Sequence, residues 1–342
     1  MSFSKLSKTL LLCAGLVALS VLLVVMAFSS PKKEGEDGTQ PLSSDEIADD
    51  PLKMNVLIAG CDRTSGLFDV MMLLSVDEAS GRVCVLQIPR DTYASYTDGS
   101  YRKLNGAPRA LGKDGFCAFL SDALGVSIDR YAALDLDAFG DIVDALGGVT
   151  LSLPDALHYD DPAQGLSIHL EAGEQTLDGA GAEQLVRYRS DYLRGDLGRL
   201  DAQKLFLAAL FRRIKAVTAS DVVRLSGAVL PAIDTDLTLP DLLSLYGLLP
   251  SISEDAVCFV TLPGQDCVGR QSGASYYVIS APSASEVMQR YFGARAEDFD
   301  IKKRFRHTTN EDFAAIYDTA CAYSVYSAAQ IGEDGIEISK TP

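Results

Sequence analysis

Short apolar runs, each closed by a glycine, a proline or a polar turn, recur along most of the chain. The run at residues 54–60 (MNVLIAG) ends in glycine, and the run at residues 82–88 (RVCVLQI) stops at Pro89. Continuous apolar runs of this length are typical of buried strands. The sequence predicts strands at residues 54–60, 70–76, 82–88, 131–136, 149–153, 256–262 and 276–279.

Segments between these runs carry apolar residues at helical spacing. Phe139 is followed three and four positions later by Ile142 and Val143, and the glycines 147 and 148 then form a stop signal. Helices are predicted at residues 116–124, 137–146, 178–186, 199–218 and 284–292, with further helical signals in 222–249. Because strands and helices alternate, we expect an α/β fold in which helices flank a mixed central β-sheet.

The segment that precedes the first strand differs from the rest of the chain. Residues 9–29 are apolar and uncharged over about 20 positions, the length that a helix needs to cross a bilayer. A cleaved signal peptide usually has an apolar stretch of only about 7–15 residues. We therefore expect an uncleaved transmembrane anchor that leaves a single-pass protein in the cell membrane.

This anchor divides the chain into segments. Residues 1–8 are expected to form a short cytoplasmic tail, and residues 30–53, rich in Pro, Gly, Ser and acids, predict a flexible stalk. Residues 54–292 are expected to form the exported domain. Residues 293–342 are less regular and are treated as a C-terminal extension of uncertain order.

Charge narrows the class of ligand. The chain has 47 acidic and 30 basic side chains, and its net charge of −17 excludes a general nucleic-acid binder. Three scattered histidines are too few for a histidine-based metal site. Four arginines nevertheless fall within one short stretch, at positions 187, 189, 194 and 199. An acidic protein that concentrates arginine in this way indicates a specific anion bound there.

The seven cysteines do not define the chemistry. They show no CxxC or metal-ligand spacing. Cys61, Cys84 and Cys117 sit in apolar stretches, where the simplest interpretation is a small buried hydrophobic residue. Cys258 and Cys267 are a candidate disulfide if the domain is exported.

Two aspartates flank the loop after the first predicted strand. Asp62 follows that strand, and Asp69 precedes the second one. If they converge at adjoining strand ends, they can bind Mg²⁺, which takes one or two carboxylates and completes its shell with water and phosphate oxygens. The alternative is a pair of loop aspartates that accept hydrogen bonds from backbone N–H groups.

A second candidate is the Arg90–Asp91 pair at the end of a buried strand. The pair can be a plain salt bridge, or Asp91 can orient the guanidinium of Arg90 so that it forks onto a phosphate. Lys103, after a polar loop, adds a possible cation.

The third candidate is the arginine-rich stretch itself. Arg187 and Arg189 share one face if that stretch is extended. Arg199 and Gln203 share a helix face, and Asp196 stands just before that predicted helix as a natural cap. Such donors match a pyrophosphate better than a carboxylate. The alternative is a solvated loop whose arginines pair with nearby acids.

Seven motifs, in this order, carry a resemblance to a known family. They are MNVLIAGCDR, FDVMMLLSVD, VLQIPRDTY, KLN, YAALDLDAFGDIVDALGGVTLSLP, GEQTLDGAGAEQLVRYRSD and GDLGRLDAQKLFL. Over residues 54–215 the chain resembles the LytR–CpsA–Psr family of membrane-anchored cell-envelope proteins of bacteria, chiefly Gram-positive ones. The resemblance implies an extracellular phosphotransferase that moves a glycopolymer phosphate from a polyprenyl-pyrophosphate lipid to peptidoglycan.

The resemblance also implies roles for individual residues. Asp62 and Asp69 look like the Mg²⁺ carboxylates, and Asp91 looks like a residue that positions arginine or accepts a proton. The residues that look like the pyrophosphate clamp and its support are Arg63, Arg90, Lys103, Arg187, Arg189, Arg199 and Gln203. Leu67 and Ala202 depart from the family pattern, because each stands where the family often has arginine.

Two other function classes stay open. The same site with water as the nucleophile would give a polyprenyl-pyrophosphate phosphatase or pyrophosphatase. The missing arginines at positions 67 and 202 also keep a non-catalytic envelope binding or regulatory protein in view.

Overall fold

The computed structural model places a mixed sheet between two layers of helices. It describes residues 51–61, 66–96, 100–162, 166–188, 196–217, 233–269, 272–295, 301, 305 and 313–333. The strands of the main sheet are β1 (Lys53–Cys61), β2 (Phe68–Asp77), β3 (Arg82–Gln87), β6 (Arg130–Leu134), β11 (Asp234–Thr235), β12 (Val257–Thr261) and β15 (Val325–Ser327). Their order in the sheet is β11-β6-β1-β2-β3-β12-β15.

Strand directions in this sheet are mixed, as the sequence predicts. β2 runs antiparallel to both β1 and β3, whereas β6 is parallel to β1 and β12 is parallel to β3. The inner positions of β1, β2 and β3 are buried on both faces. This double burial explains the continuous apolar runs of these strands.

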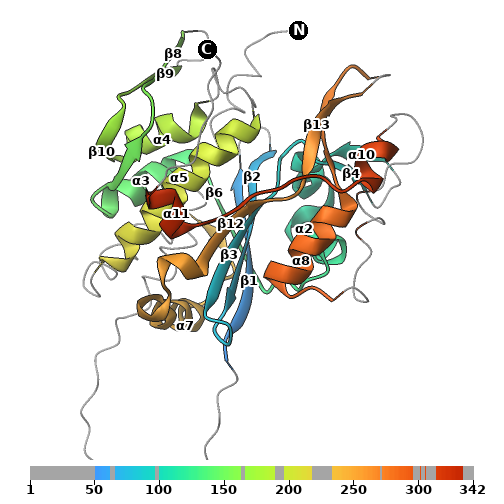
Figure 1. Cartoon of the computed structure of the whole chain (residues 1–342), viewed down its shortest axis with the longest axis horizontal. Coiled ribbons are helices and arrows are strands. Elements are labelled where there is room, and N and C mark those ends of the chain that lie inside the picture. Colours follow the sequence, from blue (N-terminus) through green and yellow to red (C-terminus); the bar gives the residue numbers. More distant parts are fainter. Residues whose placement is uncertain are drawn as a thin grey trace, which may run out of the picture.

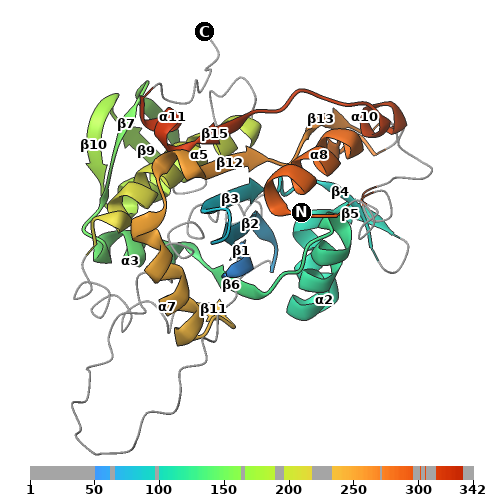
Figure 2. The same cartoon turned by 60° about the horizontal axis from the view of Figure 1, so that its bottom comes forward.

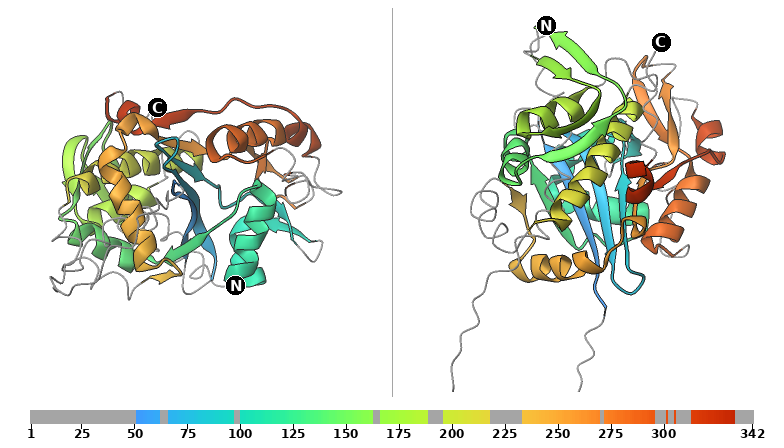
Figure 3. Two further views of the ribbon diagram at one scale, coloured as in Figure 1. Left: turned by 90° about the horizontal axis from the view of Figure 1, so that it is seen from below. Right: turned by 60° about the vertical axis from the view of Figure 1, so that its left-hand side comes forward.

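Helices cover both faces of the sheet (Figures 1 and 3). Their bounds are α2 (Ala107–Leu124), α3 (Leu136–Ala145), α4 (Gly179–Arg187), α5 (Asp196–Lys215), α7 (Leu239–Leu248), α8 (Ala281–Phe292), α10 (Ala314–Asp318) and α11 (Ala328–Glu333). The helices α3, α4 and α5 lie on one side of the sheet, and α2 and α8 lie on the other. The predicted class, α/β with helices flanking a mixed sheet, is confirmed.

Small two-stranded sheets surround this body. They are formed by β4 (Tyr93–Ser95) with β5 (Tyr101–Lys103), β7 (Val149–Leu153) with β10 (Gly173–Leu177), β8 (Leu157–Asp161) with β9 (Leu166–Leu170), and β13 (Gly264–Val268) with β14 (Ser275–Ile279). In β7 and β9 buried and exposed residues alternate, because only one face of each strand is covered. Of these strands, β7 and β14 are predicted from the sequence, and the other six are not.

Helix α5 begins earlier than predicted. Asp196 lies in its first turn rather than before it, and its carboxylate contacts Arg199 at 2.8 Å. Helix α4 fits against α3 at a close approach of two glycines, since a Cβ on Gly179 would overlap the backbone of Gly140. The two helices together with α5 therefore form one packed layer.

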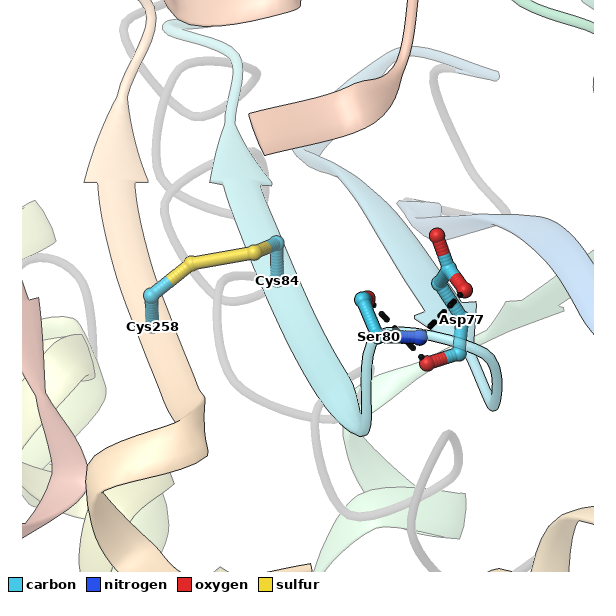
Figure 4. Close-up of a disulfide and its surroundings, with 4 residues drawn as sticks. All are labelled: Asp77, Ser80, Cys84 and Cys258. Carbon is cyan, nitrogen blue, oxygen red and sulfur yellow. Dashed lines mark hydrogen bonds between the residues drawn. A yellow bond between two sulfur atoms is a disulfide. The ribbon is translucent and has the colours of Figure 1, made fainter. Parts of the chain in front are cut away.

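A disulfide joins two neighbouring strands of the main sheet. Cys84 in β3 and Cys258 in the parallel strand β12 are register partners, 4.7 Å apart at Cα, and their sulfurs are bonded (Figure 4). The candidate Cys258–Cys267 disulfide is therefore wrong, because Cys267 lies on β13 after the chain has left the sheet. The interpretation of Cys84 as a simple buried hydrophobic residue is also wrong.

The same close-up contains the turn between β2 and β3. The backbone N–H of Ser80 donates to the Asp77 carboxylate at 3.1 Å, which stabilises this turn (Figure 4). The predicted membrane anchor at residues 9–29 lies outside the described residues. Among the helices that the structure does describe, none combines the length and apolar character needed to span a bilayer.

Candidate functional site

Polar side chains gather where β2 begins and β3 ends. The two strands are antiparallel, with Met72 opposite Gln87, and the N–H of Ile88 donates to Met71 at 2.9 Å. This pairing brings the start of β2, with Asp69, beside the loop that carries Arg90. The same edge holds the carboxyl ends of the parallel strands β3 and β12, the usual position for a ligand site in an α/β sheet.

Two arginines and two aspartates form a chain of ion pairs at this edge. Arg90 Nη1 donates to Asp69 Oδ1 at 2.9 Å, and Arg90 Nη2 lies 3.7 Å from Asp196 Oδ1. The other oxygen of Asp196 accepts from Arg199 Nη2 at 2.8 Å. One carboxylate on α5 thus lies between both guanidinium groups, and it links the loop after β3 to the helix.

Burial sets the electrostatics of this cluster. The side chain of Asp69 is fully buried, and Arg199 is only 1 % exposed. Burial raises the pKa of Asp69 above its usual value, although the charges of Arg90 and Arg199 act to lower it. An ionised Asp69 therefore depends on positive charge close by.

Asp91 and Lys103 form a second pair next to the first. Their side chains meet at 2.8 Å, and Asp91 Oδ2 lies 3.9 Å from Arg90 Nε. The hairpin of β4 and β5 brings Lys103 back to this loop, where the N–H of Asn105 donates to the carbonyl of Arg90 at 3.1 Å. Asp91 thus lies between two cations, within reach of each.

The buried face of α5 completes this edge. Arg199 and Gln203 are both 1 % exposed, and Gln87 at the end of β3 donates to the carbonyl of Leu200 at 3.0 Å. Within the residues that the structure describes, neither Arg199 Nε nor Gln203 Nε2 has a hydrogen-bond acceptor. Buried donors without partners are rare in proteins and indicate a missing ligand or water.

Arg187 stands apart from the prediction in one respect. It is the last residue of α4, and its Nη1 pairs with Glu183 at 2.6 Å one turn earlier. Because Arg187 is helical and extended backbone starts at Tyr188, the extended stretch assumed for Arg187 and Arg189 is not present at Arg187. Arg189 lies outside the described residues, as do Asp62 and Arg63.

The donor chemistry at this edge fits a hard divalent cation in part. No group of three His, Cys, Asp or Glu side chains converges on a metal position among the residues with described structure. Mg²⁺ needs only one or two carboxylates when water and phosphate oxygens fill its other positions. Asp69 offers one buried carboxylate of that kind.

Sequence reasoning undervalues two residues at this site. Asp196 is predicted as a helix cap, yet it connects Arg90 with Arg199. Gln87 is fully buried and ties β3 to α5, and its signal is a polar residue inside an otherwise apolar strand.

The chain matches the model of one protein family. The model described as the LytR_cpsA_psr family covers residues 24–292, which is most of the chain. The match includes every residue that the sequence analysis places at the candidate site.

Several named proteins are similar in sequence. The polyisoprenyl-teichoic acid–peptidoglycan teichoic acid transferase TagV of Bacillus subtilis (strain 168) is 28 % identical over 65 % of this chain and 58 % of TagV. The cell wall biosynthesis protein LcpA of Corynebacterium glutamicum is 29 % identical over 67 % of this chain and 48 % of LcpA. The chain thus spans about half the length of these two relatives. The transferase TagU of Oceanobacillus iheyensis is 27 % identical over 80 % of this chain and 86 % of TagU.

Solved structures are similar in fold. The crystal structure of B. subtilis TagV aligns with a TM-score of 0.61 at 23 % identity, covering 72 % of this chain and 98 % of that one. A structure of TagT bound to LI-WTA aligns with a TM-score of 0.57 at 24 % identity, covering 69 % of this chain and 88 % of that one. At these identities the likeness shows a shared fold.

Proposed function

The chain belongs to the LytR_cpsA_psr family, and from that premise we propose that it is a cell-envelope transferase. It moves a glycopolymer phosphate from a polyprenyl-pyrophosphate lipid to peptidoglycan. The observation that carries the proposal is the buried face of α5, where Arg199 Nε and Gln203 Nε2 are donors without an acceptor among the described residues, beside the Arg90–Asp69 pair. Such donors suit a pyrophosphate, which offers many acceptor oxygens and negative charge.

The proposed reaction is an attack of a peptidoglycan hydroxyl oxygen on the phosphorus next to the glycan. A new P–O bond forms to the acceptor, and the bond to the lipid phosphate breaks. Arg90 and Arg199 stabilise the charge that builds up on the leaving phosphate. Asp91 accepts the proton of the attacking hydroxyl, and Lys103, at 2.8 Å, holds its carboxylate in place.

Mg²⁺ is the proposed cofactor. Asp69 and Asp62 would hold it, and when bound it would supply positive charge to the phosphate oxygens. The raised pKa of Asp69 supports this role, because a buried carboxylate is ionised most readily beside a cation. Chelation with EDTA should abolish transfer, and Mg²⁺ should restore it. Mg²⁺-dependent changes in NMR signals near Asp69 provide a readout that does not depend on turnover.

We also propose that the domain works outside the cell, anchored by a helix at residues 9–29. The disulfide between Cys84 and Cys258 supports this location, since disulfides persist mainly in oxidising compartments. The anchor is tested by whether the full chain fractionates with membranes, and whether the chain that starts at residue 51 does not.

One assay separates the proposed function from its alternatives. The purified full-length protein is incubated with a lipid-pyrophosphate saccharide, Mg²⁺ and peptidoglycan fragments. Saccharide phosphate attached to peptidoglycan supports the transferase. Free saccharide phosphate without attachment indicates a phosphatase, and tight donor binding without turnover indicates a binding or regulatory protein.

A further inference from the structure

A cavity of about 250 Å³ lies next to the arginine cluster, on another side of α5. Its walls come from the first turns of α5, from the ends of β12 and β13, and from the C-terminal segment around β15. Figure 2 shows this segment as a red ribbon that runs past β12, from α10 to α11. The residues that give the cavity its chemistry are Asp201, Lys204, Thr261, Tyr277, Tyr323 and Tyr326.

The charges in the cavity wall cancel each other. Lys204 Nζ donates to Asp201 Oδ1 at 2.7 Å, and both side chains are buried. Lys204 Nζ also lies 5.8 Å from the centre of the Tyr326 ring, a cation–π distance. This wall therefore has no excess of positive charge. A neutral ligand fits it better than a phosphate.

The remaining wall combines aromatic rings with polar groups. Tyr323 and Tyr326 are half-buried, so part of each ring stays open to the cavity. The hydroxyl of Thr261 and the Asp201–Lys204 pair add hydrogen-bonding groups around these rings. A sugar ring has the matching surface, because its C–H faces pack on aromatic rings while its hydroxyls need donors and acceptors.

The cavity also lies beside the proposed site of transfer. Leu197 in its wall follows Asp196, which contacts Arg90 and Arg199. Tyr277, another wall residue, donates its backbone N–H to the carbonyl of Asp91 at 2.8 Å. Two residues of the cavity wall thus adjoin residues of the charged cluster, Leu197 through the chain and Tyr277 through a backbone hydrogen bond.

We propose that this cavity binds one neutral sugar ring of a glycan substrate and so orients that glycan toward the phosphate. The assignment rests on the proposed transferase function for its biological meaning, but the binding chemistry is read from the cavity itself. The volume is slightly below the range of about 300–1,000 Å³ for pockets that hold drug-sized ligands, which suits a single ring. The C-terminal segment thereby becomes part of the substrate site.

Binding without turnover is the first test. Chitotriose, a neutral N-acetylated saccharide, is titrated into the full-length protein in detergent and followed by saturation-transfer NMR. We expect Tyr323→Ala and Tyr326→Ala to raise the dissociation constant about tenfold, the usual effect of removing a central aromatic side chain. Tyr326→Phe keeps the ring and should change it less than twofold. Tyr159→Ala, on the distant β8–β9 hairpin, is the matched control and should also leave it unchanged.

The transfer assay then identifies the source of the sugar. The alanine variants should raise the KM of one glycan substrate about tenfold with little change in kcat. A raised KM for peptidoglycan fragments assigns the cavity to the acceptor, and a raised KM for the lipid-linked saccharide assigns it to the donor.

The outcomes separate this inference from the function on which it rests. Chitotriose binding that both alanine variants lose, in a protein without transfer activity, supports the sugar site and rejects the transferase. Normal transfer with both KM values and chitotriose binding unchanged in both variants rejects the sugar site alone. Thermal unfolding of each variant checks that the domain is still folded.

Discussion

Two aspartate–arginine pairs in this protein have similar donor–acceptor distances but different surroundings. At the sheet edge, Arg90 donates to Asp69 at 2.9 Å. At the start of β6, Arg130 donates to both oxygens of Asp241, at 2.6 and 2.9 Å, and Asp241 also accepts from the backbone and hydroxyl of Thr238. The Asp241 carboxylate is thus bound by a bidentate arginine and by Thr238, which directly precedes helix α7.

The pKa shifts of these two aspartates have opposite signs. Burial raises the pKa of Asp69 despite Arg90. Burial also acts to raise the pKa of Asp241, but hydrogen bonds from Arg130 and Thr238 outweigh it and keep the pKa below the usual value. In the Arg130–Asp241 pair, hydrogen bonds within the protein are enough to stabilise the ionised carboxylate. At the sheet edge, burial outweighs the charges of Arg90 and Arg199, and a pKa shifted by burial beside specific charges is typical of functional sites.

Substitution of the arginine in each pair should give the largest difference in transfer rate. Arg90→Ala should lower the transfer rate by about 100- to 1,000-fold, because it removes a preorganised cation from the developing phosphate charge. Arg130→Gln is the matched control and should leave the rate per folded molecule near the wild-type value. The measurement is kcat with the lipid-linked donor, alongside thermal unfolding. Near-normal transfer by Arg90→Ala would remove Arg90 from the site.

Removal of the disulfide should change the stability of the domain without altering either aspartate–arginine pair. Replacing Cys84 and Cys258 together by alanine should lower the free energy of unfolding by about 3–5 kcal/mol, because the bond closes a long loop in the unfolded chain. Guanidinium unfolding with and without reductant measures this change. At low temperature the folded variant should transfer at the normal rate. A parallel loss of activity would mean that sheet stability and the charged cluster are not separable.

Removing one carboxylate from each pair should sharpen the contrast. Asp241→Asn should cost about 1–2 kcal/mol at pH 7, because charge-assisted hydrogen bonds are lost and the partly exposed Arg130 is rehydrated. Asp69→Asn should be close to neutral or stabilising, since it removes a buried charge, yet it should abolish transfer. Urea unfolding in the presence of a chelator compares the two variants. Equal destabilisation by both would overturn the distinction.

The pH dependence of the free energy of unfolding should have opposite signs for the two aspartates. This effect should be the smallest of those predicted here. The lowered pKa of Asp241 means that its contribution is present above the unfolded value of about 3.9 and is lost as the pH falls through the folded value. The raised pKa of Asp69 has the opposite consequence, because its protonated form favours the folded state and that advantage is lost as the pH rises. Stability differences from wild type should therefore shrink at low pH for Asp241→Asn and grow with pH for Asp69→Asn. Urea titrations from pH 3 to 7 measure both.

Much of the central body follows from the sequence. Strands β1, β2 and β3 are recognisable because helices bury both of their faces, which leaves continuous apolar runs. Strands β8 and β9 are not recognisable because their exposed positions carry residues such as Asp160 and His169, which resemble a loop. The family resemblance assigns Asp69, Arg90 and Lys103 to one site, and in the structure Arg90 contacts Asp69 while Lys103 contacts Asp91.

Features that depend on long-range pairing could not be predicted in this way. Cys84 meets Cys258 because β3 and β12 pair in parallel, a register that no local pattern encodes. Asp196 connects two arginines only because α5 starts at that residue, whereas the apolar pattern places the start three residues later. The local sequence shows where charged and apolar residues lie along the chain. The pairing of distant strands and helices decides which of these residues come into contact.

The bond between Cys84 and Cys258 has a further consequence for a protein exposed to proteases. The two cysteines are 174 positions apart, and Arg90, Arg187 and Arg199 all lie between them. A single cleavage anywhere in that interval leaves two polypeptides that stay linked through sulfur. A nicked molecule would still migrate as one band without reductant, and both strands that flank the cut region would remain paired in the sheet.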